Sequence, residues 1–303
     1  MTPRAVLITG ATGKQGGSVI DAFLKTNAPF EILALTRDAR SKSSQKLLQK
    51  SPNIKLVTGN LDAIEDIFIK AKEVTNAQIW GVFSVQALTN EENQGKSLVD
   101  ASLKHGVRHF VYSSVDRGGA NSDNDPTYIP HFITKYNIEK HLFAKAKGSN
   151  MSWTVLRPVG FMDNLVPGFL GKVSNTSWEM KLKKTQKLQV IAASDIGFFA
   201  ADSFLKPESD QYRNKSISLA GDELTFDEFK NIFGQTTHET LPTTYWFLTT
   251  IVHWLVKEPR LGQMYNWFRD VGFGADIQSL KKVHPDLKDT KAWLETDSAW
   301  KSR

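Results

Sequence analysis

The sequence predicts an α/β fold, a doubly wound parallel sheet with a smaller, mainly helical C-terminal cap domain. Three observations predict it. Short apolar runs rich in β-branched residues alternate with segments of helical periodicity through the first half of the chain. A glycine-rich turn follows the first of these runs. From residue 241 onward the sequence becomes aromatic and helical. We expect a first domain over 1–160, with strands returning from 186–220, and a cap domain over 161–185 and 221–303.

The first apolar run and the glycines after it predict a dinucleotide site of the Rossmann type. Val6–Ile8 is typical of a buried parallel strand, and glycines follow at positions 10, 13 and 16 before a helical pattern begins. Gly10 allows the tight turn, Gly13 lets backbone approach a pyrophosphate, and Gly16 lets the helix lie close to the strand. The unpaired N–H groups of the helix N-terminus then face the phosphates. The alternative is a structural turn in a domain that has lost its ligand.

The second predicted strand, Glu31–Thr36, indicates which dinucleotide binds. The tip of this strand faces the adenosine ribose, where an acidic residue suits the 2′-hydroxyl of NAD and a cationic residue suits the 2′-phosphate of NADP. Arg37 comes first at this tip and Asp38 second. We therefore expect NADP(H), and Asp38 keeps NAD as the alternative. A surface arginine paired with Asp38 is the purely structural interpretation of Arg37.

Further strands are expected at 54–58, 79–85, 109–114 and 153–156, with helices at 63–73, 90–104 and 130–147. Asn60 follows the third strand at the expected adenine edge, and we expect Asp62 to cap the next helix. Ser84 ends the fourth strand, beside the expected pyrophosphate and nicotinamide ribose.

The pattern becomes less regular after the fifth strand. Residues 116–130 lack periodicity and hold two prolines, which predicts a loop over the cleft. A strand at 188–192 and a helix at 193–204, capped by Ser194 or Asp195, are expected next. A short strand at 216–219 and a helix from about residue 226 follow.

Hydride transfer requires a proton donor near the substrate carbonyl, and the sequence offers no standard one. The spacing of glycines is similar to that of the short-chain dehydrogenase/reductase superfamily, whose donor is usually the tyrosine of Tyr-x-x-x-Lys. Lys135 has the position of this lysine, but the tyrosine position holds His131. Tyr128 lies three residues before His131. The candidate catalytic residues are therefore Lys135, His131 and Tyr128.

The chain resembles the NmrA-like proteins over nearly its whole length. The motifs that carry the resemblance are Thr9–Gly16, Leu35–Asp38, Gly59–Asp62, Pro130–Phe132 with Lys135, Leu156–Pro158 with Asn164, Asp195–Gly197 and Leu219–Thr225. The resemblance implies an atypical short-chain dehydrogenase fold that binds NAD(P). The positions it assigns to the cofactor are Gly10, Thr12, Gly13, Lys14, Gln15, Gly16, Arg37, Asn60, Leu61, Ser84, Lys135, Phe161 and Asn164.

Two functions follow from this resemblance. Some family members are redox sensors that bind a transcription factor or an enzyme, and these also depart from the tyrosine pattern at the position of His131. Other, related proteins reduce substrates with a lysine and no paired tyrosine. We expect an NADP(H)-binding regulator with a protein partner, and the alternative is an NADPH-dependent reductase of a small apolar or aromatic substrate.

Composition excludes other classes of function. The absence of cysteine excludes thiol chemistry, and seven dispersed histidines do not suggest a metal site. The net charge of +6 comes from scattered lysines without a basic recognition helix, so we expect no direct nucleic-acid binding. The longest apolar stretch, 245–256, is too short to span a bilayer. We expect a cytoplasmic or nuclear protein.

Overall fold

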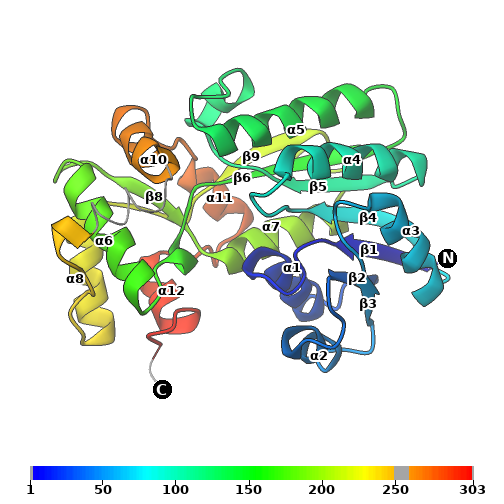
Figure 1. Ribbon diagram of the computed structural model, residues 1–303, viewed down its shortest axis with the longest axis horizontal. Helices are drawn as coiled ribbons and strands as arrows, with labels where there is room; N and C mark the ends of the chain where they lie inside the picture. The colour runs from blue at the N-terminus through cyan, green and yellow to red at the C-terminus, as the bar shows by residue number, and fades with distance from the viewer. Residues whose placement is uncertain (1–2, 249–258, 302–303) are drawn as a thin grey trace. The chain divides into compact units, whose positions relative to one another are not determined.

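The computed structural model describes residues 3–248 and 259–301, so most of the apolar stretch 245–256 and Trp254 lie outside the described residues. The chain divides into two compact units (Figure 1). The first comprises residues 1–114, 134–157 and 196–217, and the second comprises 115–133, 158–195 and 218–303. In the described ranges, no helix is both long and apolar enough to cross a membrane.

A seven-stranded sheet in the order β3-β2-β1-β4-β5-β6-β9 organises the first unit. Its strands are β1 (Arg4–Ile8), β2 (Glu31–Thr36), β3 (Ile54–Thr58), β4 (Gln78–Ser84), β5 (His109–Ser113), β6 (Ser152–Pro158) and β9 (Lys215–Leu219). The neighbouring strands from β3 to β6 pair in parallel. The order reverses between β1 and β4, as it does in a doubly wound sheet. The predicted fold class is confirmed.

Helices cover both faces of this sheet. They are α1 (Lys14–Lys25), α2 (Lys42–Leu48), α3 (Ile64–Val74), α4 (Glu91–Lys104), α5 (Pro130–Ala146) and α7 (Ala193–Leu205). One buried apolar cluster joins the strands to α3, α4 and α5. Phe204 of α7 packs on the opposite side, because a Cβ at Gly81 of β4 would lie 2.8 Å from its ring. Figure 1 shows α4 and α5 on one side of the sheet and α1 and α7 on the other.

The prediction that Asp62 caps the helix after β3 is wrong. Helix α3 begins at Ile64, its N-cap residue is Ala63, and no side chain caps it. The Asp62 carboxylate instead accepts hydrogen bonds of 2.8 Å from the side-chain amides of Asn90 and Gln94. These two bonds lower the pKa of Asp62. Hydrogen bonds from residues distant in the sequence thus take the place of the expected local capping bond.

The second unit is built around a small sheet in the order β10-β8-β7. Its strands are β7 (Gly160–Phe161), β8 (Leu188–Ile191) and β10 (Asp222–Leu224). The strand expected at 188–192 therefore pairs in this sheet, whereas the strand expected at 216–219 joins the large one as β9. The helices are α6 (Phe169–Lys181), α8 (Phe226–Thr237), α10 (Pro259–Asp270), α11 (Ile277–Val283) and α12 (Thr290–Thr296), with short 3₁₀ turns at Gly119–Asp123 and Met162–Asn164.

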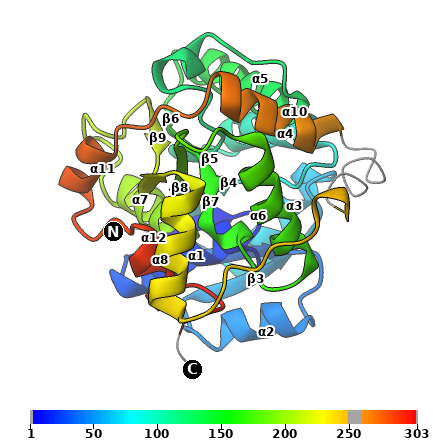
Figure 2. The same ribbon diagram turned by 90° about the vertical axis from the view of Figure 1, so that its left-hand side faces the viewer.

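Aromatic side chains form the core of the second unit. Trp178 of α6 packs against Phe226 and Phe229 of α8, with ring centroids 5.7 and 5.2 Å apart. Trp267 and Trp293 are almost fully buried in the same cluster. Helices α8 and α12 lie side by side (Figure 2). Most of the C-terminal tryptophans within the described residues therefore act as core residues of this unit.

Two buried carboxylates fix the loops of the second unit. Asp116 is fully buried and accepts hydrogen bonds from the backbone N–H groups of Gly118, Gly119 and Gly274 and from the hydroxyl of Ser218. These bonds join three distant parts of the chain. The segment 116–130, expected as a loop, is thus anchored at its start and contains a 3₁₀ turn.

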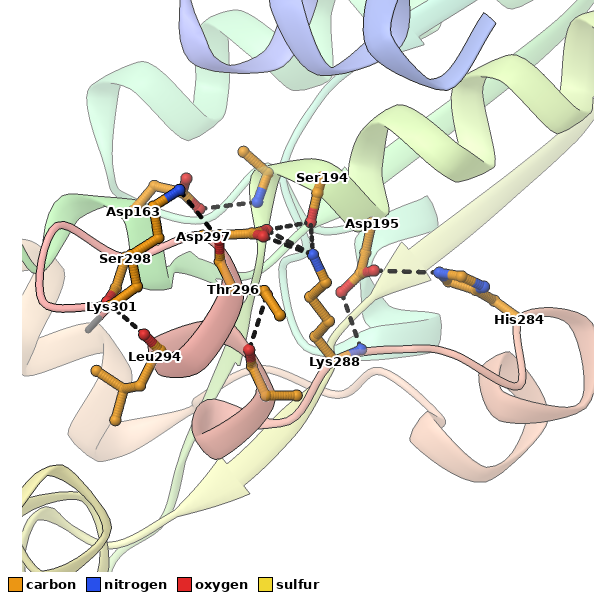
Figure 3. Close-up of polar contacts among 12 residues, drawn as sticks. Asp163, Ser194, Asp195, His284, Lys288, Leu294, Thr296, Asp297, Ser298 and Lys301 are labelled. Atoms are coloured by element: carbon orange, nitrogen blue, oxygen red, sulfur yellow. Dashed lines mark hydrogen bonds and ion pairs between the residues drawn. The ribbon is translucent and has the colours of Figure 1, made fainter. Parts of the chain in front are cut away.

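Asp195 is the second of these carboxylates. It is 1% exposed and contacts His284 at 3.1 Å and the backbone N–H of Lys288 at 3.1 Å. The ammonium of Lys288 in turn contacts Ser194 and, at 2.7 Å, both carboxylate oxygens of Asp297 (Figure 3). This network fixes the C-terminal segment to the start of α7. Ser194 and Asp195 lie inside α7, so the helix does not begin with either of them as expected.

Candidate functional site

The glycine turn between β1 and α1 forms a cradle that tolerates no side chains. Gly10 has a φ of +60°, and a Cβ there would lie 2.8 Å from the Val85 side chain. A Cβ at Gly16 would lie 2.4 Å from the carbonyl oxygen of Gly10. The Gly13 N–H donates to that same carbonyl at 2.8 Å, which closes the turn. Gly10 and Gly16 therefore have the roles predicted from the sequence, the tight turn and the close helix.

The first turn of α1 leaves room for an anion. Gly13 is the N-cap residue, no side chain caps the helix, and its first turn holds no acidic residue. Thr12, Gly13 and Lys14 are exposed, and Gln15 is half-buried. The partial positive charge of the helix N-terminus and the exposure of its first turn favour a phosphate at this position.

Hydrogen bonds tie the glycine turn to the ends of β4 and β5. The Thr9 hydroxyl donates to the Val85 carbonyl at 2.8 Å and accepts from the Val85 N–H at 2.7 Å. The Ser113 hydroxyl donates to the side-chain oxygen of Gln15. Ser84, at the end of β4, is buried and accepts from the amide of Gln86 at 2.8 Å. Hydrogen bonds thus connect the glycine turn to the residues at the carboxyl ends of β4 and β5.

The tip of β2 presents a free cation. Arg37 is exposed, and its guanidinium has no ion-pair partner among residues 3–248 and 259–301. Asp38 does not pair with it, and one Asp38 carboxylate oxygen accepts the Arg40 N–H at 2.8 Å instead. The Asp38 carbonyl accepts from Ser44 of α2, which fixes the turn. An exposed, unpaired guanidinium suits a phosphate better than a ribose hydroxyl, and the neighbouring carboxylate already accepts one hydrogen bond.

A hollow of about 440 Å³ adjoins the end of β3. It is lined by residues of the segment after β3 and of α3 and α4, among them Leu61, Asp62 and Asn90. Asn60 is exposed next to it and accepts the Asp62 N–H at 3.2 Å. The two residues assigned to the adenine side of the cofactor, Asn60 and Leu61, therefore lie at one opening of the first unit.

Lys135 lies above the end of β5 in an ion pair. Its ammonium is 2.8 Å from a carboxylate oxygen of Glu91, at the start of α4, and 3.2 Å from the Ser113 carbonyl. The Thr134 hydroxyl donates to the other Glu91 oxygen at 2.8 Å. The Glu91 side chain is only 2% exposed and that of Lys135 is 13% exposed. A buried carboxylate thus offsets the charge of the candidate catalytic lysine.

Four other candidate residues belong to the second unit, namely Tyr128, His131, Phe161 and Asn164. Tyr128 is about half exposed, and the His131 ring packs on Phe132 with centroids 4.6 Å apart. Asn164 lies in the 3₁₀ turn of residues 162–164. The Asp163 carboxylate of this turn accepts the Ala193 N–H at 2.8 Å (Figure 3). The first unit alone gathers the other assigned cofactor positions and Lys135.

Sequence reasoning missed Glu91, and it gave Ser113 no role. Glu91 looks like an ordinary acidic residue in the first turn of a helix, which complements the helix dipole. Its pairing with Lys135 joins α4 to α5 across 43 intervening residues and has no local signal in the sequence. Among the residues that the structure describes, no group of three or more histidine, aspartate or glutamate side chains is placed to hold a metal ion.

A family model and several curated proteins are similar to this chain. The family model of the NmrA-like family matches residues 2–293. The NmrA-like family domain-containing oxidoreductase hkm9 of Aspergillus hancockii is 36% identical over 262 residues, which cover 77% of this chain and 74% of that protein.

The solved structures that share the fold include a reductase and a transcriptional regulator. The triphenylmethane reductase of Citrobacter sp., complexed with NADP(H), has a TM-score of 0.69 at 18% identity and covers 97% of this chain and 99% of its own. Nmra, a negative transcriptional regulator in complex with NAD, has a TM-score of 0.67 at 14% identity and covers 98% and 95%. The same fold thus occurs in a reductase and in a regulator.

Proposed function

The chain belongs to the NmrA-like family, and we propose that its first unit binds NADP(H) and that the protein acts as a redox-sensing regulator through a protein partner. The glycine cradle carries this proposal. A Cβ at Gly16 would lie 2.4 Å from the Gly10 carbonyl oxygen, and the α1 N-terminus beside it is uncapped. A turn that merely connects a strand to a helix has no need of three glycines and an open helix end.

The phosphorylated dinucleotide is favoured by Arg37. Its guanidinium is exposed and has no ion-pair partner in the described part of the chain, while Asp38 is engaged with the Arg40 N–H. NAD is the alternative, because one Asp38 oxygen is left to meet a ribose hydroxyl. The solved relatives include complexes with NADP(H) and with NAD.

A sensing role is favoured over standard dehydrogenase turnover by the residues at the two positions of the Tyr-x-x-x-Lys motif. His131 stands at the tyrosine position of Tyr-x-x-x-Lys, and its ring packs on Phe132. The charge of Lys135, which would otherwise activate a neighbouring hydroxyl, is paired with Glu91. The partner we propose is a transcription factor or an enzyme, met in the cytoplasm or the nucleus.

A calorimetric titration with NADP⁺, NADPH, NAD⁺ and NADH, side by side, tests this function. We expect the phosphorylated pair to bind more tightly, and the oxidised and reduced forms to differ in affinity. A difference is required, because a ligand can signal only through unequal interaction with two states. Equal affinity of the protein for NADP⁺ and NADPH would contradict the sensing role.

The second candidate is a reductase of a small apolar or aromatic substrate. It is favoured by Lys135, which keeps the position used by lysine-dependent reductases and lies 3.2 Å from the Ser113 carbonyl. His131 or Tyr128 would then supply the proton. Oxidation of NADPH can be followed at 340 nm with menadione as the acceptor. Turnover that disappears in Lys135→Ala, with NADPH binding retained, would establish the reductase in place of the sensor.

A further inference from the structure

We propose that Glu91 is a positioning residue that sets the preference of the cofactor site between NADP⁺ and NADPH. The inference rests on the proposed cofactor binding and goes beyond it, because it names the group that makes the two redox forms unequal. The nicotinamide ring carries a positive charge in NADP⁺ and none in NADPH. Any fixed charge close to the ring therefore favours one form over the other.

The topology places the Glu91–Lys135 pair in the nicotinamide half of the site. In a doubly wound sheet each half of the dinucleotide lies over one half of the strands, and the halves meet where the strand order reverses. That reversal lies between β1 and β4. Lys135 contacts the Ser113 carbonyl at the end of β5, and Glu91 begins the helix that follows β4. Both residues therefore belong to the β4–β5 half of the sheet, whereas Arg37 follows β2 in the other half.

The Glu91–Lys135 pair is close and buried, so its charges act strongly on their surroundings. The two charged groups are 2.8 Å apart, and the Glu91 side chain is 2% exposed. Water screens such buried charges weakly. A second buried carboxylate of this half, Glu139, pairs with Arg157 at 2.7 Å and accepts a hydrogen bond from the Ser114 hydroxyl, so its charge is already offset. Glu91 is therefore the group that cancels the charge of Lys135 next to the expected nicotinamide.

The sign of the effect follows from the charges. With both partners present, the pair is close to neutral, and NADP⁺ meets no repulsion. Replacing Glu91 by glutamine leaves the shape of the side chain and an oxygen for the Thr134 hydroxyl, but the Lys135 ammonium is no longer offset. The cationic ring of NADP⁺ is then repelled, whereas the neutral ring of NADPH is not. The dissociation constant for NADP⁺, divided by that for NADPH, must rise.

The test measures this ratio by calorimetric titration of the full-length protein with NADP⁺ and NADPH. For Glu91→Gln we expect a rise on the order of tenfold, the effect of one unit charge acting through a partly screened interior. The double variant Glu91→Gln/Lys135→Met removes both charges and should return the ratio to within about twofold of the wild-type value.

Glu92 supplies the matched control. It is the next residue of α4, its carboxylate pairs with Lys96, and it accepts from Asn137 of α5 at 3.0 Å. Glu92→Gln removes the same charge from the same turn and should leave the ratio unchanged. Equal weakening of both redox forms in Glu91→Gln would mean that Glu91 only supports the fold, and would overturn the inference. Failure of the wild-type protein to bind either form would instead overturn the proposed function, and this inference with it.

Discussion

Local glycines and long-range carboxylates order two parts of the molecule in different ways. In the first unit, glycines close together in the sequence shape the turn of the candidate site, as in Gly10 and Gly16. In the second unit carboxylates hold together segments that are far apart in the sequence. Asp116 joins residues near 118, 218 and 274, and Asp195 joins α7 to residues 284–288. The first kind of order can be recognised from local sequence, and the second cannot.

The largest effect should come from closing the glycine cradle. Gly16→Ala places a Cβ 2.4 Å from the Gly10 carbonyl oxygen, so α1 must shift away from the phosphate position. We expect NADP⁺ affinity to fall by about a hundredfold, measured by calorimetry. Gly17→Ala is the matched control, because its Cβ would lie 3.5 Å from the nearest atom, an ordinary contact. Similar losses in both variants would show that the cradle has no special role.

The corresponding change in the second unit should affect stability. Asp116→Asn replaces a fully buried carboxylate by an amide whose nitrogen cannot accept the Ser218 or Gly119 donors. We expect the free energy of unfolding to fall by about 2–3 kcal/mol, measured by urea denaturation followed by tryptophan fluorescence. Asp286→Asn, at an exposed position of the same unit, should change it by less than about 0.5 kcal/mol. A small effect of Asp116→Asn would remove the contrast between the units.

His109 makes the stability of the first unit depend on pH. Burial lowers its pKa to about 3, from about 6.5 in the unfolded chain. The unfolded state therefore takes up the proton first as pH falls, so this contribution is complete above about pH 6.5 and declines below it. We expect a loss of about 2 kcal/mol in the free energy of unfolding between pH 7 and pH 5. For His109→Gln, denaturation curves should show that the free energy of unfolding depends less steeply on pH than in the wild-type protein. The same pH dependence in both proteins would show that His109 is not the group responsible.

A smaller effect is expected at the tip of β2. Arg37→Ala removes the exposed guanidinium and should weaken NADP⁺ binding by about tenfold, with NAD⁺ affinity changed by less than twofold. Arg213→Ala, an exposed arginine of the same unit that pairs with Glu208, is the control. Parallel losses for both dinucleotides in Arg37→Ala would show that Arg37 does not contact the 2′-phosphate.

The sequence was sufficient to predict the parts of the molecule that depend on local pattern. The strands of the large sheet through β6 and the glycine turn were all visible as periodicity and spacing. Helix α2 was not expected, because Lys42–Leu48 is short and mostly polar. Helix α6 was also missed, since the predicted pattern there was irregular.

Contacts between residues far apart in the sequence explain the remaining differences between the predicted and the observed structure. Asp62 looked like a helix cap and instead binds Asn90 and Gln94 of another helix. Glu91, which has no special signal in the local sequence, lies in the first turn of α4 and pairs with Lys135. In each case the side chain can interact either with groups near it in the sequence or with a distant residue. The local sequence indicates only the nearby interaction. The candidate site was therefore predictable in its glycines and in Arg37, but not in the charge that surrounds Lys135.

A crystal structure of the protein grown with NADP⁺ would test the central claim most directly. We expect the pyrophosphate over the N-terminus of α1 at Gly13, with the 2′-phosphate within hydrogen-bond distance of the Arg37 guanidinium. The nicotinamide ribose should lie beside Lys135, with the Glu91–Lys135 pair intact. A dinucleotide bound elsewhere, or a 2′-phosphate turned away from Arg37, would contradict it.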